Sequence, residues 1–282
     1  MELVDTNRHY ARDPNLKLED VKRVLNWTKN QYHLTQIQAI LFLQKSKYDI
    51  ESAQKAVDAY FTFKTTASDV FLGRNLENER FQRTFNAFIY TTLPAQTPEG
   101  YTVLYAKALD PNPDHYHVIS CVKYIDMVLT SHLYHQGKSA GFVWLVDLKD
   151  VPYGFVKSID HEVFKKFLHY VQKVIPWEFK GVHLLTEIPF VDEVVNLVAT
   201  CKEETTNLYV HTNLDELAKL IPKSCLPSDR GGSAETIKTL HENIKEKIIR
   251  SANIFHREDK QVVDESKRFG KSLNGSAKQT IF

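Results

Sequence analysis

The sequence predicts an α/β protein that begins with a small helical bundle, and two patterns lead to that prediction. Over residues 1–90 the apolar side chains recur at helical spacing. After Leu93, short apolar runs typical of strands alternate with longer segments typical of helices. We therefore expect a helical domain over residues 1–90, an α/β domain over 91–235, and a C-terminal helix and tail over 236–282.

The N-terminal bundle is predicted from successive stripes of apolar residues separated by only a few polar ones. Asp13-Pro14 provides a start signal for the first helix, and Asp49 provides one for the third. The stripes are Leu18, Val21, Val24 and Leu25, then Leu34, Ile37, Ile40 and Leu41, then Ala53, Ala56, Val57 and Tyr60, with a last short helix over Phe81–Tyr90.

The α/β part is predicted to start after a loop over Leu93–Gly100, which holds two prolines. The expected strands are Tyr101–Ala106, Phe142–Val146, Gly181–Leu185 and Asn207–His211. The expected helices are Val118–His135, His161–Val174, Phe190–Cys201, Leu214–Ile221 and Ser233–Ser251. The second strand is apolar throughout, so both of its faces should be covered. Phe255–Phe282 has few apolar residues and is expected to wrap the surface or be partly disordered.

Composition excludes several classes of protein. Among 282 residues, 36 Lys and Arg balance 35 Asp and Glu, so overall charge gives no support to nucleic-acid binding. Three separated cysteines without a CxxC motif disfavour a disulfide framework and a cysteine zinc site. The N-terminus has no signal-peptide pattern, and the longest apolar run, Ala140–Val146, is too short to cross a bilayer. These features predict a cytoplasmic protein.

Catalytic motifs are incomplete throughout the sequence. Gly137–Ser139 resembles the end of a phosphate-binding loop, but His132 occupies the position of the required first glycine. His161-Glu162 begins a zinc-protease motif whose second histidine is replaced by Lys165. Asp147 follows the apolar strand, where a buried loop-capping role is the simpler interpretation. We therefore expect no catalytic residue, no metal site and no cofactor, and we favour a binding protein over an enzyme.

Bulky apolar residues are unusually concentrated in the α/β part. Phe142 and Trp144 fall on one face of a strand, and the helix over Phe190–Cys201 is apolar over a wide arc. On periodicity alone an ordinary core remains the default interpretation. The alternative is a dry cavity that holds a lipophilic ligand mainly by burial, at about 0.8 kcal/mol per methylene group.

Several segments occur in the order and at the spacing of a known family. They are Ile40–Ala53, Gly141–Lys149, Gly181–Glu187, the stretch ending at His211, Leu226–Gly232 and Val263–Lys271. Together they resemble the motifs of the CRAL-TRIO family, in particular its tocopherol- and retinaldehyde-carrying and clavesin-like members. Each motif is weak alone, but their shared order is specific.

The resemblance implies an α/β lipid-binding domain in which a sheet floors an apolar pocket and a mobile helix acts as a gate. Family members carry one hydrophobic ligand and release it at membranes without catalysing a reaction. Carried over position by position, the resemblance implies that the ligand contacts Val122, Ile125, Phe142, Trp144, Val146, Ile175, Trp177, Phe179, Val182, Phe190, Val194, Leu197, Val198 and Cys201.

The sequence departs from the family where some members bind a phosphoinositide headgroup through a basic cleft. The matching positions are Glu178, Lys180, Glu203 and Asn207. Because only Lys180 keeps a positive charge, it is the single candidate for contact with a phosphoinositide.

The leading hypothesis is a cytoplasmic, monomeric carrier of a terpenoid, retinoid, carotenoid or tocopherol-like ligand. The bulky Phe142, Trp144 and Trp177 should make the cavity too narrow for a two-chain phospholipid. We expect transient membrane contact and no nucleic-acid partner. The alternative is a membrane or protein adaptor with a vestigial cavity, and an enzyme is a third hypothesis.

Overall fold

A five-stranded mixed sheet forms the centre of the α/β part. The computed structural model describes residues 4–29 and 31–264. The strands are β1 (Phe88–Gln96), β2 (Tyr101–Ala108), β3 (Gly141–Asp147), β4 (Phe179–Leu185) and β5 (Asn207–His211). They lie in the order β1-β2-β3-β4-β5; β1 is antiparallel to β2, and the other pairs are parallel. The four strands expected from the sequence are therefore confirmed.

Strand β1 corrects two expectations. The helix predicted over Phe81–Tyr90 ends at Ala87, and the chain continues as a strand to Gln96, through the first half of the expected loop Leu93–Gly100. Phe88 and Tyr90 alternate with residues that face the other side of the sheet, a period-two pattern that the helix prediction overlooked. Pro94 is accommodated because β1 is an edge strand whose pairing is irregular between Thr92 and Gln96.

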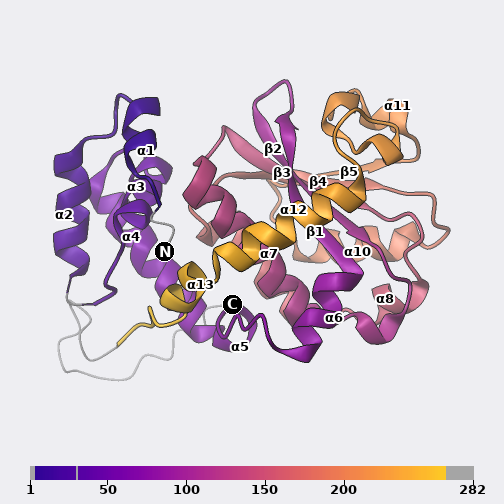
Figure 1. Cartoon of the computed structure of the whole chain (residues 1–282), viewed down its shortest axis with the longest axis horizontal. Helices are drawn as coiled ribbons and strands as arrows, with labels where there is room; N and C mark the ends of the chain where they lie inside the picture. Colours follow the sequence, from indigo (N-terminus) through magenta and orange to yellow (C-terminus); the bar gives the residue numbers. More distant parts are fainter. Residues whose placement is uncertain (1–3, 30, 265–282) are drawn as a thin grey trace.

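In Figure 1 the first four N-terminal helices lie at the left, beside the sheet part, and the last two lie at the foot of the molecule. They are α1 (Asn7–Arg12), α2 (Leu18–Thr28), α3 (Gln36–Lys45), α4 (Ile50–Thr66), α5 (Ser68–Phe71) and α6 (Glu79–Ala87). Side-chain caps fix the starts of two long ones. Thr35 and Gln38 form a capping box before α3, and the Asp49 carboxylate accepts the Ser52 N–H at the start of α4.

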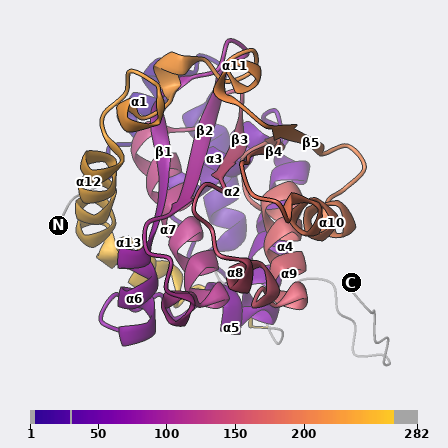
Figure 2. The same cartoon turned by 90° about the vertical axis from the view of Figure 1, so that its right-hand side faces the viewer.

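The remaining helices cover the two faces of the sheet. They are α7 (Val118–Gln136), α8 (Tyr153–Lys157), α9 (His161–His169), α10 (Val191–Cys201), α11 (Leu214–Leu217), α12 (Ile237–Arg250) and α13 (Ala252–Glu258), with a π-helical turn at Tyr170–Val174 and 3-10 turns at Pro113–His115, Lys223–Cys225 and Ser228–Arg230. In Figure 2, α8, α9 and α10 gather on one side of the strands and α11 lies on the other.

The C-terminal part differs from the expected tail. Ala252–Glu258 is helical and Phe255 is fully buried, so the chain packs well beyond the point where apolar residues become scarce. Figure 1 shows α12 and α13 running across the molecule toward the N-terminal helices. The remainder of the expected tail, residues 265–282, lies outside the described residues.

A buried ionic cluster joins three distant parts of the chain. The Asp126 carboxylate, in the middle of α7, lies 3.0 Å from the Lys64 amine of α4 and 2.8 Å from the Arg74 guanidinium. Arg74 also lies 3.1 Å from Glu258 and 2.8 Å from Asp259 at the end of α13. Burial by itself opposes ionisation of Asp126, but Lys64 and Arg74 outweigh it and hold its pKa below the usual value.

A pair of buried histidines lies on the face of the sheet away from α7. The His183 Nδ1 atom on β4 is 3.0 Å from the His211 Nε2 atom on β5, and the two rings are stacked. Burial, together with the smaller effect of the neighbouring His211, lowers the pKa of His183 to about 4, and burial also lowers that of His211. Both rings are therefore neutral at pH 7.

We expect Asp126→Asn to destabilise the protein strongly, because it leaves the buried Lys64 and Arg74 without their central counter-charge. The expected loss is about 3–5 kcal/mol in the free energy of unfolding, measured by urea denaturation. Glu246→Gln, which breaks an exposed pair with Arg250, serves as control and should cost less than about 1 kcal/mol. Equal losses in the two variants would contradict this assignment.

The depressed pKa of His183 predicts loss of stability in mild acid. Below pH 6.5 the unfolded chain binds a proton at this histidine that the folded protein excludes down to about pH 4. Stability should therefore fall from pH 7.5 to pH 5, with this site contributing about 2 kcal/mol. In urea denaturation His183→Gln should flatten the pH dependence, whereas His161→Gln, which changes an exposed ring, should leave it unchanged.

Candidate functional site

An apolar cavity of about 140 Å³ lies between the sheet and the helices on the α7 side. Strands β1 to β4 form its floor, α7 forms one wall, and α8, α9 and α10 with their connections form the rest. The cavity thus lies where the fold brings two strands from before α7 together with two strands and three helices that follow it.

The floor follows from strand alternation. In β3 and β4, Trp144 pairs with Val182 and Val146 pairs with Leu184, so all four side chains project from the same face. On the opposite face, Val143 and Leu145 belong to a separate apolar core beneath α11 and α12. Because each face has its own cover, β3 is buried on both sides, as its uninterrupted apolar sequence predicted.

Aromatic rings define the two ends of the cavity. Phe155 of α8 packs against Phe88 of β1 and Tyr116 before α7, with ring centroids 5.5 Å apart in both pairs. On the opposite wall, the Trp144 ring meets Phe167 of α9 edge to face at 5.3 Å. These rings are large and have few rotamers, so they give the cavity a defined shape.

Helix α10 closes the side of the cavity next to β4. Val194, Leu197 and Val198 face inward, whereas Asp192 and Glu193 are exposed to solvent. Phe190, just before α10, contacts the exposed Tyr153 of α8 at a ring distance of 5.0 Å. This contact joins the two helical elements that lie over the cavity.

The cavity wall carries little charge. Burial raises the pKa of the Cys121 thiol to about 12 and raises that of Tyr90 well above its usual value, so both groups are neutral. The Trp144 indole N–H is buried and has no hydrogen-bond partner within the described part of the chain. A ligand in this space would therefore meet hydrocarbon, aromatic rings and one unsatisfied donor.

The charged groups near the rim are already engaged. Asp147, at the end of β3, accepts hydrogen bonds from Tyr105 and from the Lys149 N–H, and its carboxylate lies 2.6 Å from the Arg230 guanidinium. The Lys107 amine donates to the Lys149 carbonyl at 2.8 Å. Asp147 thus caps the loop after β3, as the sequence analysis favoured, but its ion pair with Arg230 was not foreseen.

The structure divides the fourteen predicted ligand contacts into two groups. Eight line this cavity, namely Val122, Ile125, Trp144, Val146, Val182, Val194, Leu197 and Val198. Six do not, namely Phe142, Ile175, Trp177, Phe179, Phe190 and Cys201. The assignment of all fourteen as ligand contacts remains a prediction.

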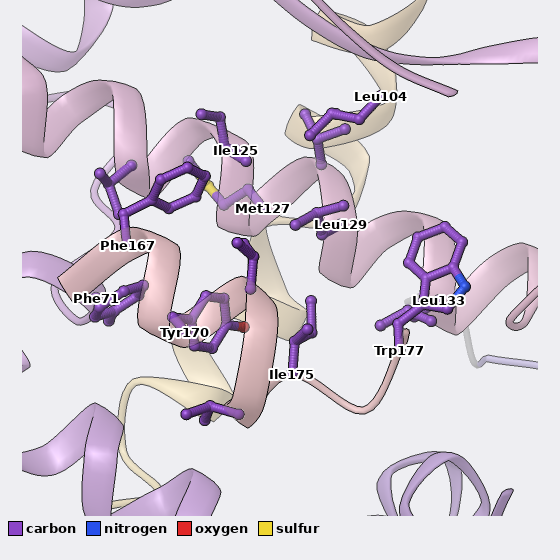
Figure 3. Close-up of a cluster of buried hydrophobic side chains, with 14 of the residues drawn as sticks. Phe71, Leu104, Ile125, Met127, Leu129, Leu133, Phe167, Tyr170, Ile175 and Trp177 are labelled. Carbon is purple, nitrogen blue, oxygen red and sulfur yellow. The ribbon is translucent and has the colours of Figure 1, made fainter. Parts of the chain in front are cut away.

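Trp177 shows why spacing alone misplaces residues. Its ring stacks on His132 near the end of α7 and contacts Phe142 at 4.8 Å. Figure 3 shows Trp177 beside Leu133, at the opposite end of the cluster from Ile125 and Phe167. Trp177 and Phe142 belong to the same apolar core as the cavity residues but lie beyond the end of the cavity. The sequence pattern does not predict where along α7 a residue packs.

Several cavity residues were missed by the sequence analysis. They include five aromatic residues of β1, α8 and α9, namely Phe88, Tyr90, Phe155, Phe164 and Phe167. The alternation of Phe88 and Tyr90 could have revealed β1 and its inward face. No comparable signal marked Phe155, because α8 is only five residues long.

The Lys180 amine pairs with Glu178, and the next residue, Gly181, lies opposite the uncharged Asn207 of β5. Glu203 lies 3.4 Å from Lys173. The positions that the resemblance associates with phosphoinositides therefore carry compensated charges. Contact of Lys180 with a phosphoinositide remains a prediction.

Within the described residues, no helix combines the length and apolarity needed to span a bilayer. The same part of the chain contains no cluster of three His, Cys, Asp or Glu side chains arranged to hold a metal ion.

Comparisons with known proteins agree with this architecture. The CRAL/TRIO domain model matches residues 89–232, slightly more than half of the chain. Among solved structures, the crystal structure of Sfh5 is similar at a TM-score of 0.50 and 14% identity, covering 82% of this chain and 83% of that one. Curated protein sequences give no match. The chain belongs to the CRAL/TRIO family.

Proposed function

We propose that this protein binds and carries one small lipophile in the cavity beneath α10. The apolar cavity itself is the observation that supports the proposal, because neutral side chains from the sheet and four helices form nearly all of its boundary, and its two charged members, Lys107 and Asp147, already have partners. Family membership supports lipophilic ligand binding in general. We infer the size and kind of ligand from the volume of the cavity and from the residues that form its walls.

A slender or ring-containing lipophile suits these walls better than a two-chain phospholipid. The cavity volume of about 140 Å³ is close to that of a cavity that holds benzene, whereas ligand pockets usually span about 300–1,000 Å³. A terpenoid, retinoid, carotenoid or tocopherol-like molecule must therefore displace part of the wall as it enters. A ten-carbon segment would gain about 8 kcal/mol by burial, before the costs of immobilisation and of opening the wall.

Helix α10 is the part of the wall that we expect to move as a gate. Its inward face makes apolar contacts only, and no side chain caps its N-terminus. The Phe190–Tyr153 contact that joins it to α8 is partly exposed, so breaking it costs little burial. The floor, in contrast, is fixed by the strand ladder and by β3 packing on both faces.

We further propose that the protein acts without catalysis, as a cytoplasmic monomer that touches membranes transiently. Asp147 is fully engaged by Arg230 and Tyr105, which supports a structural role for this carboxylate. A membrane or protein adaptor with a vestigial cavity is the second candidate, favoured by the small volume of the cavity. Loading of a ligand distinguishes the two.

Native mass spectrometry of the protein purified from its own source, followed by organic extraction, tests the carrier proposal. We expect one lipophile per chain, because burial in an apolar cavity gives slow release. A consistently empty protein that also fails to bind a panel of terpenoids, retinoids and tocopherols would favour the adaptor. Flotation with liposomes would then test its membrane contact.

Trp144→Ala should shift ligand preference toward longer or bulkier molecules, because the indole forms a wall of the cavity. We expect about tenfold weaker binding of the smallest ligands in a chain-length series, measured by displacement of a fluorescent lipophile. Trp177→Ala is the matched control, since it removes an equally large buried ring outside the cavity. A similar shift in both variants, or in neither, would contradict the assigned cavity.

A further inference from the structure

A second cleft, of about 480 Å³, lies beyond the C-terminal end of α7 and shares no lining residue with the apolar cavity. Segments from α1, β1, β2, the α7–β3 connection and α12 meet there. Its lining is Arg12, Thr92, Leu93, Pro94, Gln96, Thr102, His132, Gln136, Gly137, Lys138, Ser139 and Lys247. The cleft is therefore mostly polar, and it is built from parts of the chain far apart in sequence.

The charges in this cleft have one sign. Arg12, Lys138 and Lys247 approach from three different elements, and the lining includes no carboxylate. The two acids near Lys138 are otherwise engaged: Asp13 accepts hydrogen bonds from Gln44 and Tyr48, and Glu178 pairs with Lys180. Both acids act on Lys138 from outside the lining, and neither one faces the cleft. Three cations that face one space repel one another and favour an anion between them.

Lys247 is the most informative of the three. It is half-buried near the end of α12, and its side-chain amine forms no ion pair or hydrogen bond with any residue of the described ranges 4–29 and 31–264. Burial lowers its pKa, and no neighbouring carboxylate acts against that effect. Arg12 and Lys138 each use one N–H group on a backbone carbonyl, of Gln136 and Gln44, and keep further donors.

Neutral donors complete the surroundings. His132 is uncharged at neutral pH because burial lowers its pKa to about 3, and its Nδ1 atom lies 3.0 Å from the Thr92 hydroxyl. The Thr102 hydroxyl donates to Ser139, whose own hydroxyl donates to the Gly141 carbonyl, so neither proton is left for a ligand. The side-chain amides of Gln96 and Gln136, which also line the cleft, are neutral donors of the kind that oxyanions accept from.

We infer that this cleft binds a phosphate ester, with Lys247 as its principal charged contact and Arg12 and Lys138 flanking it. A doubly charged phosphate needs more than one cation for neutralisation, which suits three that converge from separate elements, whereas a carboxylate needs one. The ester belongs either to a free small molecule or to a phospholipid headgroup. This inference does not depend on the lipophile proposed for the other cavity.

Isothermal titration of the full chain with inorganic pyrophosphate tests the site directly. We expect saturable binding that weakens as salt is raised and at least tenfold weaker binding by Lys247→Gln. Lys238→Gln removes the same charge from an exposed position on the same helix and should change affinity less than twofold. Unchanged melting temperatures and lipophile binding in both variants would show that fold and apolar cavity are intact.

Flotation with phosphatidylcholine vesicles containing 10 mol% phosphatidate distinguishes the two sources. Flotation that Lys247→Gln abolishes assigns the site to a lipid headgroup. Binding of pyrophosphate without flotation assigns it to a free, water-soluble phosphate compound. Absence of both, or equal binding by Lys247→Gln and the unmodified chain, would overturn the inference.

Discussion

One buried carboxylate, Asp126 in the middle of α7, connects the N-terminal helices, the sheet domain and the C-terminal helix. A charge with no exposed surface is tolerated only where partners surround it, and here Lys64, Arg74 and the Tyr170 hydroxyl do so. Each partner comes from a different element, so the position of α7 fixes theirs. The interaction specifies an arrangement more than it adds to net stability, because desolvation offsets most of the attraction.

Helix α7 therefore organises two different environments at its ends. Its first turns, with Val122 and Ile125, form a wall of the apolar cavity. Its last turns, with His132 and Gln136, border the second cleft, which is lined by Arg12, Lys138 and Lys247 and is called the basic cleft below. Asp126, at the centre of the ionic cluster, lies between these two sets of residues along the helix. A single rigid helix thus separates a space suited to hydrocarbon from one suited to an anion.

The two spaces also differ in how readily they change shape. The apolar cavity is small for a lipid and is covered partly by α10, whose contacts are apolar and carry little directional constraint. The basic cleft is bordered by strand ends and by the turn at Gly137, where a positive φ of 81° suits glycine. We expect ligand entry to deform the first space and leave the second nearly unchanged.

Local pattern was sufficient for much of the fold. Period-two and helical spacing located β2 to β5 and the long helices, and the uninterrupted apolar run of β3 predicted burial on both faces. The same patterns failed at β1, where Phe88 and Tyr90 follow a helix without a break. They failed again at Phe255, whose burial depends on α13 packing against residues far away in sequence.

The sequence by itself determined the fold class, the family resemblance and an apolar ligand face, because these depend on spacing along single elements. Only the tertiary structure decided which bulky residues line the cavity. Trp144 and Trp177 both lie in short apolar segments with alternating large side chains, but they pack against different parts of α7. Only the tertiary structure brought Arg230 to Asp147 and Lys247 toward Arg12. These contacts depend on how whole helices and strands pack together, and the periodicity of residues along the chain does not predict the distance between two elements.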